Sequence, residues 1–306
     1  MVVLALALLA QAGVDWKKDY GAALQEARKD GRYVVVFFGG PDCPPCARMG
    51  ETTFKDKAVA EHVNKTYVNV YVVLEGPSEV AKQFGVEAIP TTFLVASDGT
   101  RVRKWEGYLG PEEYRKGLET AAAAHPKAKE LEAKLKLDPD SPELNAEAAK
   151  IYEALGRSRA AADALKRVAG RQEDPKARAK TLVRALGHLT MVETDEPLNE
   201  EMLAIAAEVE KLDASQRGEA LAVRAQVAMN REKPDEAIAL FEEVVEKHPA
   251  CDKAAASLLW LADLYHHAKK DNAKAKKTLE RILEKYPKSD VVDDARALLE
   301  HLKEHE

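Results

Sequence analysis

Several features that would assign this chain to other classes of protein are absent from its 306 residues. There is no long basic run, and 46 lysines and arginines face 52 aspartates and glutamates, which argues against nucleic-acid binding. No apolar run reaches the roughly 20 residues that a membrane-spanning helix needs. Cysteine is scarce, with three residues in the chain. The composition, 46% hydrophobic and 32% charged, is that of a globular protein long enough for two domains.

The first twelve residues contain the most continuous apolar segment. Residues 2–10 are all apolar, and Ala10, Gln11 and Ala12 have the small-x-small form of a cleavage site. A secretory signal normally opens with a basic residue, whereas the first one here is Lys17. We expect residues 1–12 to be a signal peptide and the protein to be exported to the periplasm or cell envelope. The alternative is a buried N-terminal segment of a cytoplasmic protein.

Residues 13–124 alternate β-branched runs with amphipathic segments, which predicts an α/β domain. Three segments have the pattern of helices: 20–30, 78–84 and 111–124. Four segments have the pattern of strands: 33–38, 66–74, 91–96 and 101–106. With one more helix after the first strand, the order predicts a three-layer α/β/α sheet. We expect right-handed crossovers between its first, parallel strands and an antiparallel hairpin at its end.

A pair of cysteines follows the first predicted strand, in Cys43-Pro44-Pro45-Cys46. At the start of a helix, free backbone N–H groups and the positive end of the helix dipole would stabilise a thiolate at Cys43. Cys46 would lie one turn inward, where it can attack a mixed disulfide on Cys43 and close a small ring. Half of a zinc site is the alternative at this spacing, but no second pair exists to complete it. We therefore predict a redox pair and no metal.

Downstream of the cysteines, Ile89-Pro90-Thr91 begins a predicted strand, a position at which proline is tolerated. Together the two motifs resemble the thioredoxin family, in which a cis-proline lies against the cysteine pair. The resemblance covers roughly residues 15–124 and implies that Pro90 supports the active site, as Pro44 and Pro45 do, while the backbone at Ile89 and Thr91 binds an extended substrate segment. Further residues are similar to the thiol-disulfide interchange subgroup of bacterial envelopes: Cys46-x-x-Met49, Thr53-Phe54 and Val59.

Two positions depart from thioredoxin itself. That protein has a buried Asp six residues before its first active-site Cys and a Lys on the following strand, whereas Phe37 and Tyr71 occupy these positions here. Asp42 and Glu87 are the other nearby carboxylates, and neither is a secure replacement for the internal base. The resemblance implies a thiol-disulfide oxidoreductase with no cofactor beyond its own disulfide. Its direction, as an oxidant, a reductant or an isomerase, stays open.

Beyond Pro126 the strand signals vanish and a period of 38 residues appears. Three series carry this period: Leu165, Leu203, Phe241 and Leu279; Ala149, Gly187 and Ala225; Pro249 and Pro287. The pattern resembles the tetratricopeptide repeat, most clearly at Ala237-x-x-x-Phe241 and Leu261-Ala262-x-x-Tyr265. It implies an all-α repeat domain at residues 126–306, with four helical pairs capped by a helix at 290–301. We expect Trp260 and Tyr265 to fill its core.

Two functional hypotheses follow. In the first, the cysteine pair exchanges electrons with protein thiols and disulfides, while the repeats dock a protein substrate or a redox partner. In the second, the repeats form a scaffold and the redox domain is an accessory or a sensor. Cys251 is expected to be inert, or to couple to a partner if the protein is exported. His301 and His305 have a metal-binding spacing, although a helix end that favours positive charge explains them better.

Overall fold

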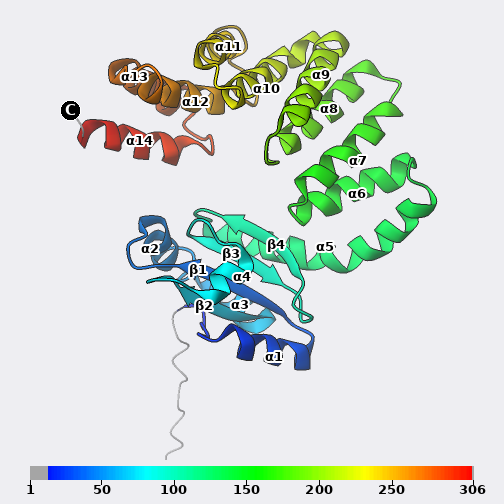
Figure 1. Ribbon diagram of the computed structural model, residues 1–306, viewed down its shortest axis with the longest axis vertical. Helices are drawn as coiled ribbons and strands as arrows, with labels where there is room; N and C mark the ends of the chain where they lie inside the picture. Colours follow the sequence, from blue (N-terminus) through cyan, green and yellow to red (C-terminus); the bar gives the residue numbers. More distant parts are fainter. Residues whose placement is uncertain (1–12, 305–306) are drawn as a thin grey trace, which may run out of the picture. The chain divides into compact units, whose positions relative to one another are not determined.

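The computed structural model describes residues 13–304, which form two compact units (Figure 1). Residues 1–12, including the predicted signal peptide, lie outside the described residues. The first unit runs to Lys136 and also includes residues 150–157, and the second contains residues 137–149 and everything from Ser158 onward.

The first unit contains a four-stranded mixed sheet with the strand order β2-β1-β3-β4. Its strands are β1 (Tyr33–Gly39), β2 (Tyr67–Val73), β3 (Thr91–Val95) and β4 (Arg101–Glu106). β1 pairs with β2 in parallel and with β3 in antiparallel orientation, and β3 and β4 form an antiparallel hairpin. The four predicted strands and the final hairpin are therefore confirmed.

The first unit has five helices: α1 (Tyr20–Asp30), α2 (Pro44–Glu51), α3 (Lys57–Thr66), α4 (Glu79–Phe84) and α5 (Pro111–Leu137), the last of which ends at the boundary of the unit. Helix α1 ends where predicted, because Gly31 adopts the left-handed conformation that favours glycine (φ 70°). Between β1 and β2 there are two helices where the sequence predicted one. The second of them, α3, is capped by Asp56, whose side chain accepts a hydrogen bond from the Val59 N–H (2.9 Å).

Helix α5 is longer than its sequence pattern indicated. It was expected to end at Ala124, but it continues through Pro126 to Leu137. Proline removes one hydrogen bond from a helix interior, so other contacts must offset this cost. Ala121, Ala128 and Leu131 are buried on both sides of the proline, and this continuous apolar stripe favours an unbroken helix.

The two faces of the sheet have different cores. On one face Val34, Val36 and Phe38 of β1 pack with α1 and α4, through residues that include Ala27 and Phe84. On the other face, the strand residues Phe37 and Tyr71 belong to a cluster of aromatic rings. The cluster also includes Trp16, Phe54 and Tyr114 from outside the strands. Tyr114 belongs to α5, so helices cover both faces and the predicted three layers are confirmed.

The remaining helices follow one another along the chain as the repeat pattern predicted (Figure 1). They are α6 (Pro142–Ala154), α7 (Ser158–Gly170), α8 (Pro175–Leu189), α9 (Glu196–Leu212), α10 (Arg217–Asn230), α11 (Pro234–Lys247), α12 (Ala254–His267), α13 (Asn272–Lys285) and α14 (Val292–Glu304). This is four helical pairs followed by one terminal helix, as expected.

Most positions of the 38-residue period lie in the core. Leu165, Phe241 and Leu279 are each at most 2% exposed, whereas Leu203 is only half-buried. Tyr265 is buried as predicted, but the prediction for Trp260 is wrong, because its side chain is 46% exposed. The buried residues of α12 form one face of the helix, and Trp260 lies outside this face.

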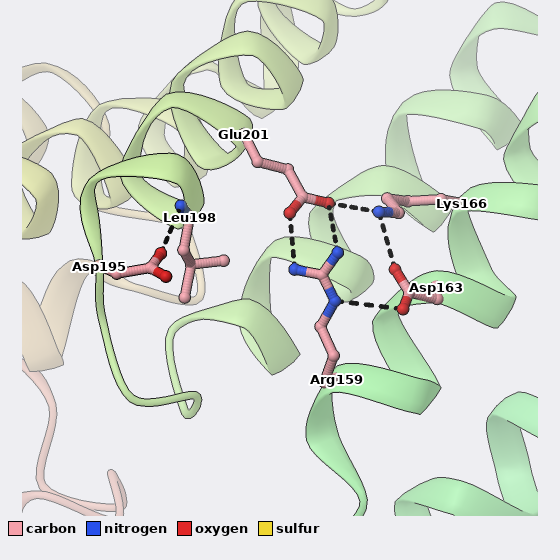
Figure 2. A network of polar contacts seen from close by, with 6 residues as sticks. All are labelled: Arg159, Asp163, Lys166, Asp195, Leu198 and Glu201. Carbon is pink, nitrogen blue, oxygen red and sulfur yellow. Dashed lines mark hydrogen bonds and ion pairs between the residues drawn. The ribbon is translucent and has the colours of Figure 1, made fainter.

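Charged side chains connect successive repeats at the surface. Figure 2 shows such a network between α7 and α9, in which Glu201 contacts both Arg159 (2.7 Å) and Lys166. Asp163 completes it with contacts to Arg159 (3.1 Å) and Lys166 (2.8 Å). Two positive and two negative groups thus balance one another across the interface between the first two repeats.

Candidate functional site

The two cysteines of the motif form a disulfide at the start of α2. Their Cα atoms are 5.2 Å apart, and both residues are nearly buried, with 6% of Cys43 and 5% of Cys46 exposed. The central strand β1 leads directly into this turn. The disulfide therefore follows the carboxyl end of a buried strand, which is the position that the sequence predicted for the cysteine pair.

Glycines at the end of β1 allow the chain to approach its neighbours closely. A Cβ atom on Gly40 would lie 2.7 Å from the Leu74 carbonyl oxygen and 3.3 Å from Ile89 Cδ1. The Leu74 N–H also donates a hydrogen bond to the Gly39 carbonyl (2.7 Å). A larger residue at position 40 would push the turn away from the end of β2, so glycine positions the cysteines there.

Cys43 is the N-cap residue of α2, and its sulfur is placed to receive hydrogen bonds. Pro44 and Pro45 occupy the first helical positions and have no N–H groups to offer. The first amide that can donate is that of Cys46, and it donates to Cys43 Sγ at 3.2 Å. This hydrogen bond and the positive end of the helix dipole both favour negative charge on Cys43.

The loop before β3 lies against this turn. The Ile89–Pro90 peptide bond is cis, which the resemblance implied, and Pro90 is buried. The Pro90 carbonyl accepts a hydrogen bond from the Gly107 N–H (2.8 Å), and Thr91 Oγ1 donates to the Ala88 carbonyl (2.7 Å). Within residues 13–304 the backbone N–H and C=O groups of Ile89 have no hydrogen-bond partner. Ile89 thus has backbone groups that an extended chain could pair with.

An aromatic cluster occupies the positions at which thioredoxin has a charged pair. Phe37 lies opposite Tyr71 in the sheet register, with ring centroids 5.0 Å apart, and 4.8 Å from Phe54. Burial raises the pKa of the Tyr71 hydroxyl. Trp16 completes the cluster at 5.9 Å from Phe37, and its part in the cluster was not predicted because a single aromatic residue outside a regular element has no spacing signal. No carboxylate lies in this cluster, and Asp42 and Glu87 are exposed.

A second contact that the sequence did not indicate joins α2 to the loop after β4. The Arg48 guanidinium carbon lies 4.0 Å from the centroid of the Tyr108 ring, an arrangement that favours the cation. The Tyr108 hydroxyl is 3.1 Å from Thr52 Oγ1 at the end of α2. These contacts fix the helix that carries the cysteines to the segment whose Gly107 bonds Pro90.

The other candidate residues belong to the repeat unit and, within the described part of the chain, carry no ligand set. Cys251 is half-buried in the repeat unit, and burial, followed by the nearby Glu219 carboxylate, raises the pKa of its thiol. The His301 ring lies 6.0 Å from the His266 ring, while His305 is outside the described residues. Across residues 13–304 no group of three or more potential ligands could hold a metal ion, and no helix has the length and apolarity to cross a bilayer.

Comparisons with known proteins match the two parts of the chain separately. The thioredoxin-like domain family matches residues 20–122, and the tetratricopeptide repeat family matches residues 228–299. An Arabidopsis thaliana protein described as thioredoxin H10 is 34% identical over 101 residues, which are 33% of this chain and 60% of that protein. The chain thus spans less than two thirds of the length of this relative.

Solved structures resemble each part in turn. A thioredoxin from Thermus thermophilus is 27% identical and covers 36% of this chain and 88% of its own, with a TM-score of 0.33. A tetratricopeptide-repeat protein from the same species is 21% identical and covers 61% of this chain and 95% of its own, with a TM-score of 0.41.

Proposed function

We propose that this chain, which joins a thioredoxin-like domain to tetratricopeptide repeats, is a thiol-disulfide oxidoreductase whose redox centre is the Cys43–Cys46 pair. The observation that carries the proposal is the position of Cys43 as the N-cap of α2, where its sulfur accepts the Cys46 N–H. This position favours the thiolate, which is the reactive form in disulfide exchange.

The reaction proceeds through two exchanges. In the reducing direction the Cys43 thiolate attacks one sulfur of a client disulfide, forms a mixed disulfide and releases the other client sulfur as a thiolate. The Cys46 thiolate then attacks Cys43 Sγ, which closes the internal disulfide and releases the second client thiol. Two electrons pass to the client, and a reducing partner must restore the dithiol. The oxidising direction is the reverse and needs an oxidising partner.

The loop around Pro90 binds the client beside the cysteines. The unpaired backbone groups of Ile89 can form two hydrogen bonds with an extended client segment, as an added strand does at a sheet edge. Thr91 and Pro90 hold this loop in place through their contacts to Ala88 and Gly107. Binding through the backbone selects for an extended disulfide-bearing segment and places little demand on its sequence.

The repeats dock the protein client or the redox partner, and export to the periplasm or cell envelope would bring the enzyme to disulfide-bonded clients. Tethering a client near Cys43 raises the local concentration of its disulfide without changing the chemistry. Sequencing the N-terminus of the protein purified from its host tests export, since cleavage after Ala12 is expected. An intact Met1 would contradict this part of the proposal.

Single-cysteine variants test the redox reaction. With a disulfide-bonded protein client, C46A should accumulate mixed disulfides because the resolving thiolate is missing, whereas C43A should accumulate few. Non-reducing gel electrophoresis followed by reduction separates the two outcomes. Equal trapping by both variants would show that Cys43 is not the attacking thiol.

A competition experiment with the full chain separates the docking hypothesis from the scaffold hypothesis. The C43A/C46A double variant keeps the repeats and cannot exchange disulfides. If the repeats dock clients, an excess of this variant should slow the wild-type reaction with the protein client more than an equal excess of a C43A/C46A fragment of residues 13–157, which keeps the Pro90 loop without the following repeats, and neither should affect the reaction with a small disulfide. The absence of such competition would refute docking. If the wild-type protein captures partners but shows no exchange activity, the scaffold hypothesis is favoured.

A further inference from the structure

A cavity of about 60 Å³ in the repeat unit opens beside the exposed ring of Trp260. It lies among the end of α8, α10, α11 and α12. Its lining consists of apolar side chains, three neutral polar ones and one lysine: Ala222, Val223, Phe241, Ala256 and Trp260; Thr190, Gln226 and Ser257; Lys253. The exposed tryptophan and the cavity therefore form one apolar site on the surface of the repeats.

The cavity has a buried floor and an accessible mouth. Phe241 and Ser257 are at most 2% exposed and form the floor. Trp260 is 46% exposed, and Gln226 and Ala256 are half-buried, so these three side chains keep surface that a partner can reach. A group that enters from solvent contacts the Trp260 ring on one side and the apolar wall on the other.

The size of the cavity selects one kind of side chain. A water-sized group needs roughly 10–15 Å³ of such space, so a cavity of this volume holds about four to six of them. The side chains of leucine, isoleucine and methionine have about this number of heavy atoms. Alanine would leave most of the space empty, and the two rings of tryptophan would exceed it.

The charge at the cavity is positive. Lys253 is the only charged residue in the lining, and within residues 13–304 its ammonium group forms no ion pair. Asp252, the neighbouring carboxylate in the chain, lines a different, larger cavity. A carboxylate on the partner would therefore find an unpaired cation here.

Gln226 offers hydrogen bonds to the backbone of a partner. Its side-chain N–H donates to the Thr190 carbonyl over a long distance (3.4 Å), which uses one of the two donors of the amide and none of its acceptor capacity. An extended peptide presents a backbone N–H and C=O that such an amide can bind together. The wall thus has one group for each part of an extended segment: side chain, backbone and charge.

We propose that this cavity docks a leucine, isoleucine or methionine side chain of an extended client segment, with an acidic residue next to it in the client that pairs with Lys253. The inference rests on the docking role proposed above and names the chemistry of the segment that is docked. Folded proteins bury most of these apolar side chains, whereas unfolded chains expose them. Docking here therefore favours clients that have not completed folding.

Calorimetric titration of the full-length oxidised protein with blocked pentapeptides tests the class of ligand. Acetyl-Gly-Glu-Leu-Glu-Gly amide should bind, and replacing its leucine with alanine should weaken binding by about tenfold or more, because about three buried carbon groups are lost. Tryptophan in place of leucine should also weaken binding, because its rings do not fit. Replacing both glutamates with lysine should weaken binding several-fold, and high salt should reduce this difference.

Variants of the protein locate the binding to this cavity. W260A should weaken binding of the leucine peptide by about tenfold or more, and A256L should do the same by filling the cavity while the ring stays. K253Q should remove the preference for glutamate over lysine and keep the preference for leucine over alanine. L137A is the matched control, since Leu137 is also a large exposed apolar residue but does not line the cavity, and its affinity should be unchanged.

The docking reaction and the redox reaction are separated by the choice of substrate. Saturating leucine peptide should slow disulfide exchange with an unfolded, disulfide-bonded protein client and leave exchange with a small disulfide unchanged. Loss of exchange with the small disulfide in the wild type would refute the proposed redox function, while peptide binding would still be measurable. Peptide binding without any effect on the client reaction would show that this cavity does not dock clients.

Further results would overturn the inference whatever the redox activity is. These are the absence of binding by the leucine peptide at millimolar concentration and equal binding of the leucine and alanine peptides. Self-association of the wild type that W260A abolishes would assign the site to a second copy of the chain instead. Circular dichroism establishes whether W260A is folded, and if it is not, A256L decides the matter.

Discussion

Replacing Phe37 with aspartate would place a carboxylate in the aromatic cluster beside the redox turn. The ring of Phe37 lies against Gly39, where an added Cβ atom would be 2.9 Å from Phe37 Cε1, and Gly39 is followed by the turn that carries Cys43. A negative charge at this position opposes the thiolate at Cys43. Because the thiolate exists only in the reduced protein, the charge destabilises the reduced state and makes the pair a stronger reductant.

The size of this effect follows from Coulomb's law. Two charges about 7 Å apart at an effective dielectric constant of about 20 interact by roughly 2 kcal/mol. For a two-electron couple this corresponds to a shift of about 45 mV toward more negative potential. The shift is an upper limit, since it is reached only when both Cys43 and the new carboxyl group are ionised.

The substitution also removes a buried ring. Phe37 is 1% exposed and contacts three other aromatic side chains, and loss of such a residue typically costs about 3–5 kcal/mol of stability. Phe37→Asn creates nearly the same cavity without the charge. The difference between the two variants therefore isolates the electrostatic effect from the loss of packing.

Equilibration with glutathione buffers of known potential, at several pH values, measures the shift. Phe37→Asp should be more reducing than Phe37→Asn at neutral and higher pH, and the difference should vanish as the pH falls and the aspartate is protonated. Thermal unfolding of both variants serves as the control for folding. Equal potentials for the two folded variants at every pH would refute the idea that position 37 acts on the thiols.

Three further predictions concern stability. Arg103→Ala should lower the free energy of unfolding by about 2 kcal/mol in urea titrations, because the Arg103 guanidinium donates to the Ala154 carbonyl at the end of α6 (2.6 Å), and Arg103→Lys should recover part of this loss. Burial raises the pKa values of Asp163 and Glu201, but hydrogen bonds from Lys166 and Arg159 outweigh it and leave both lowered. The network in Figure 2 should therefore stabilise the fold at pH values above the ordinary pKa values of 3.8 and 4.5, and this contribution should disappear as the pH falls through the lowered pKa values. The free energy of unfolding of D163N/E201Q should therefore depend less on pH in the acid range than that of the wild type. A fragment of residues 13–157 should melt at a higher temperature than one of residues 13–124, because it keeps the rest of the first unit and the hydrogen bond from Arg103 to the Ala154 carbonyl, and equal melting temperatures would contradict this.

The features that the sequence predicted correctly depend on local signals. The strand of residues 33–38, the glycine after α1 and the cysteine pair each have a short pattern with a direct physical meaning. The 38-residue period was equally informative, because each repeat must present its apolar residues at equivalent positions. The position of the cysteine pair at the start of a helix and the order of the helical pairs could therefore be predicted from the sequence.

The features that were missed depend on contacts between distant residues. Pro126 is normally a signal for the end of a helix, and only the buried residues on both sides of it keep α5 continuous. Trp16 and Phe37 are 21 positions apart, and nothing in their spacing indicates that their rings meet. Trp260 is a large apolar residue of the kind that usually packs in a core, but it is exposed because of the face of α12 on which it lies.

The two prolines between the cysteines have a consequence for the energetics of ring closure. Pro44 and Pro45 fix the φ angles of the first turn of α2, so that the backbone between the two sulfurs has little freedom in either redox state. When the disulfide is reduced, the thiols cannot diffuse far apart, and the effective concentration of one near the other stays high. Restricting the open state in this way favours the closed ring, so the prolines and the helix dipole act on the redox equilibrium in opposite directions.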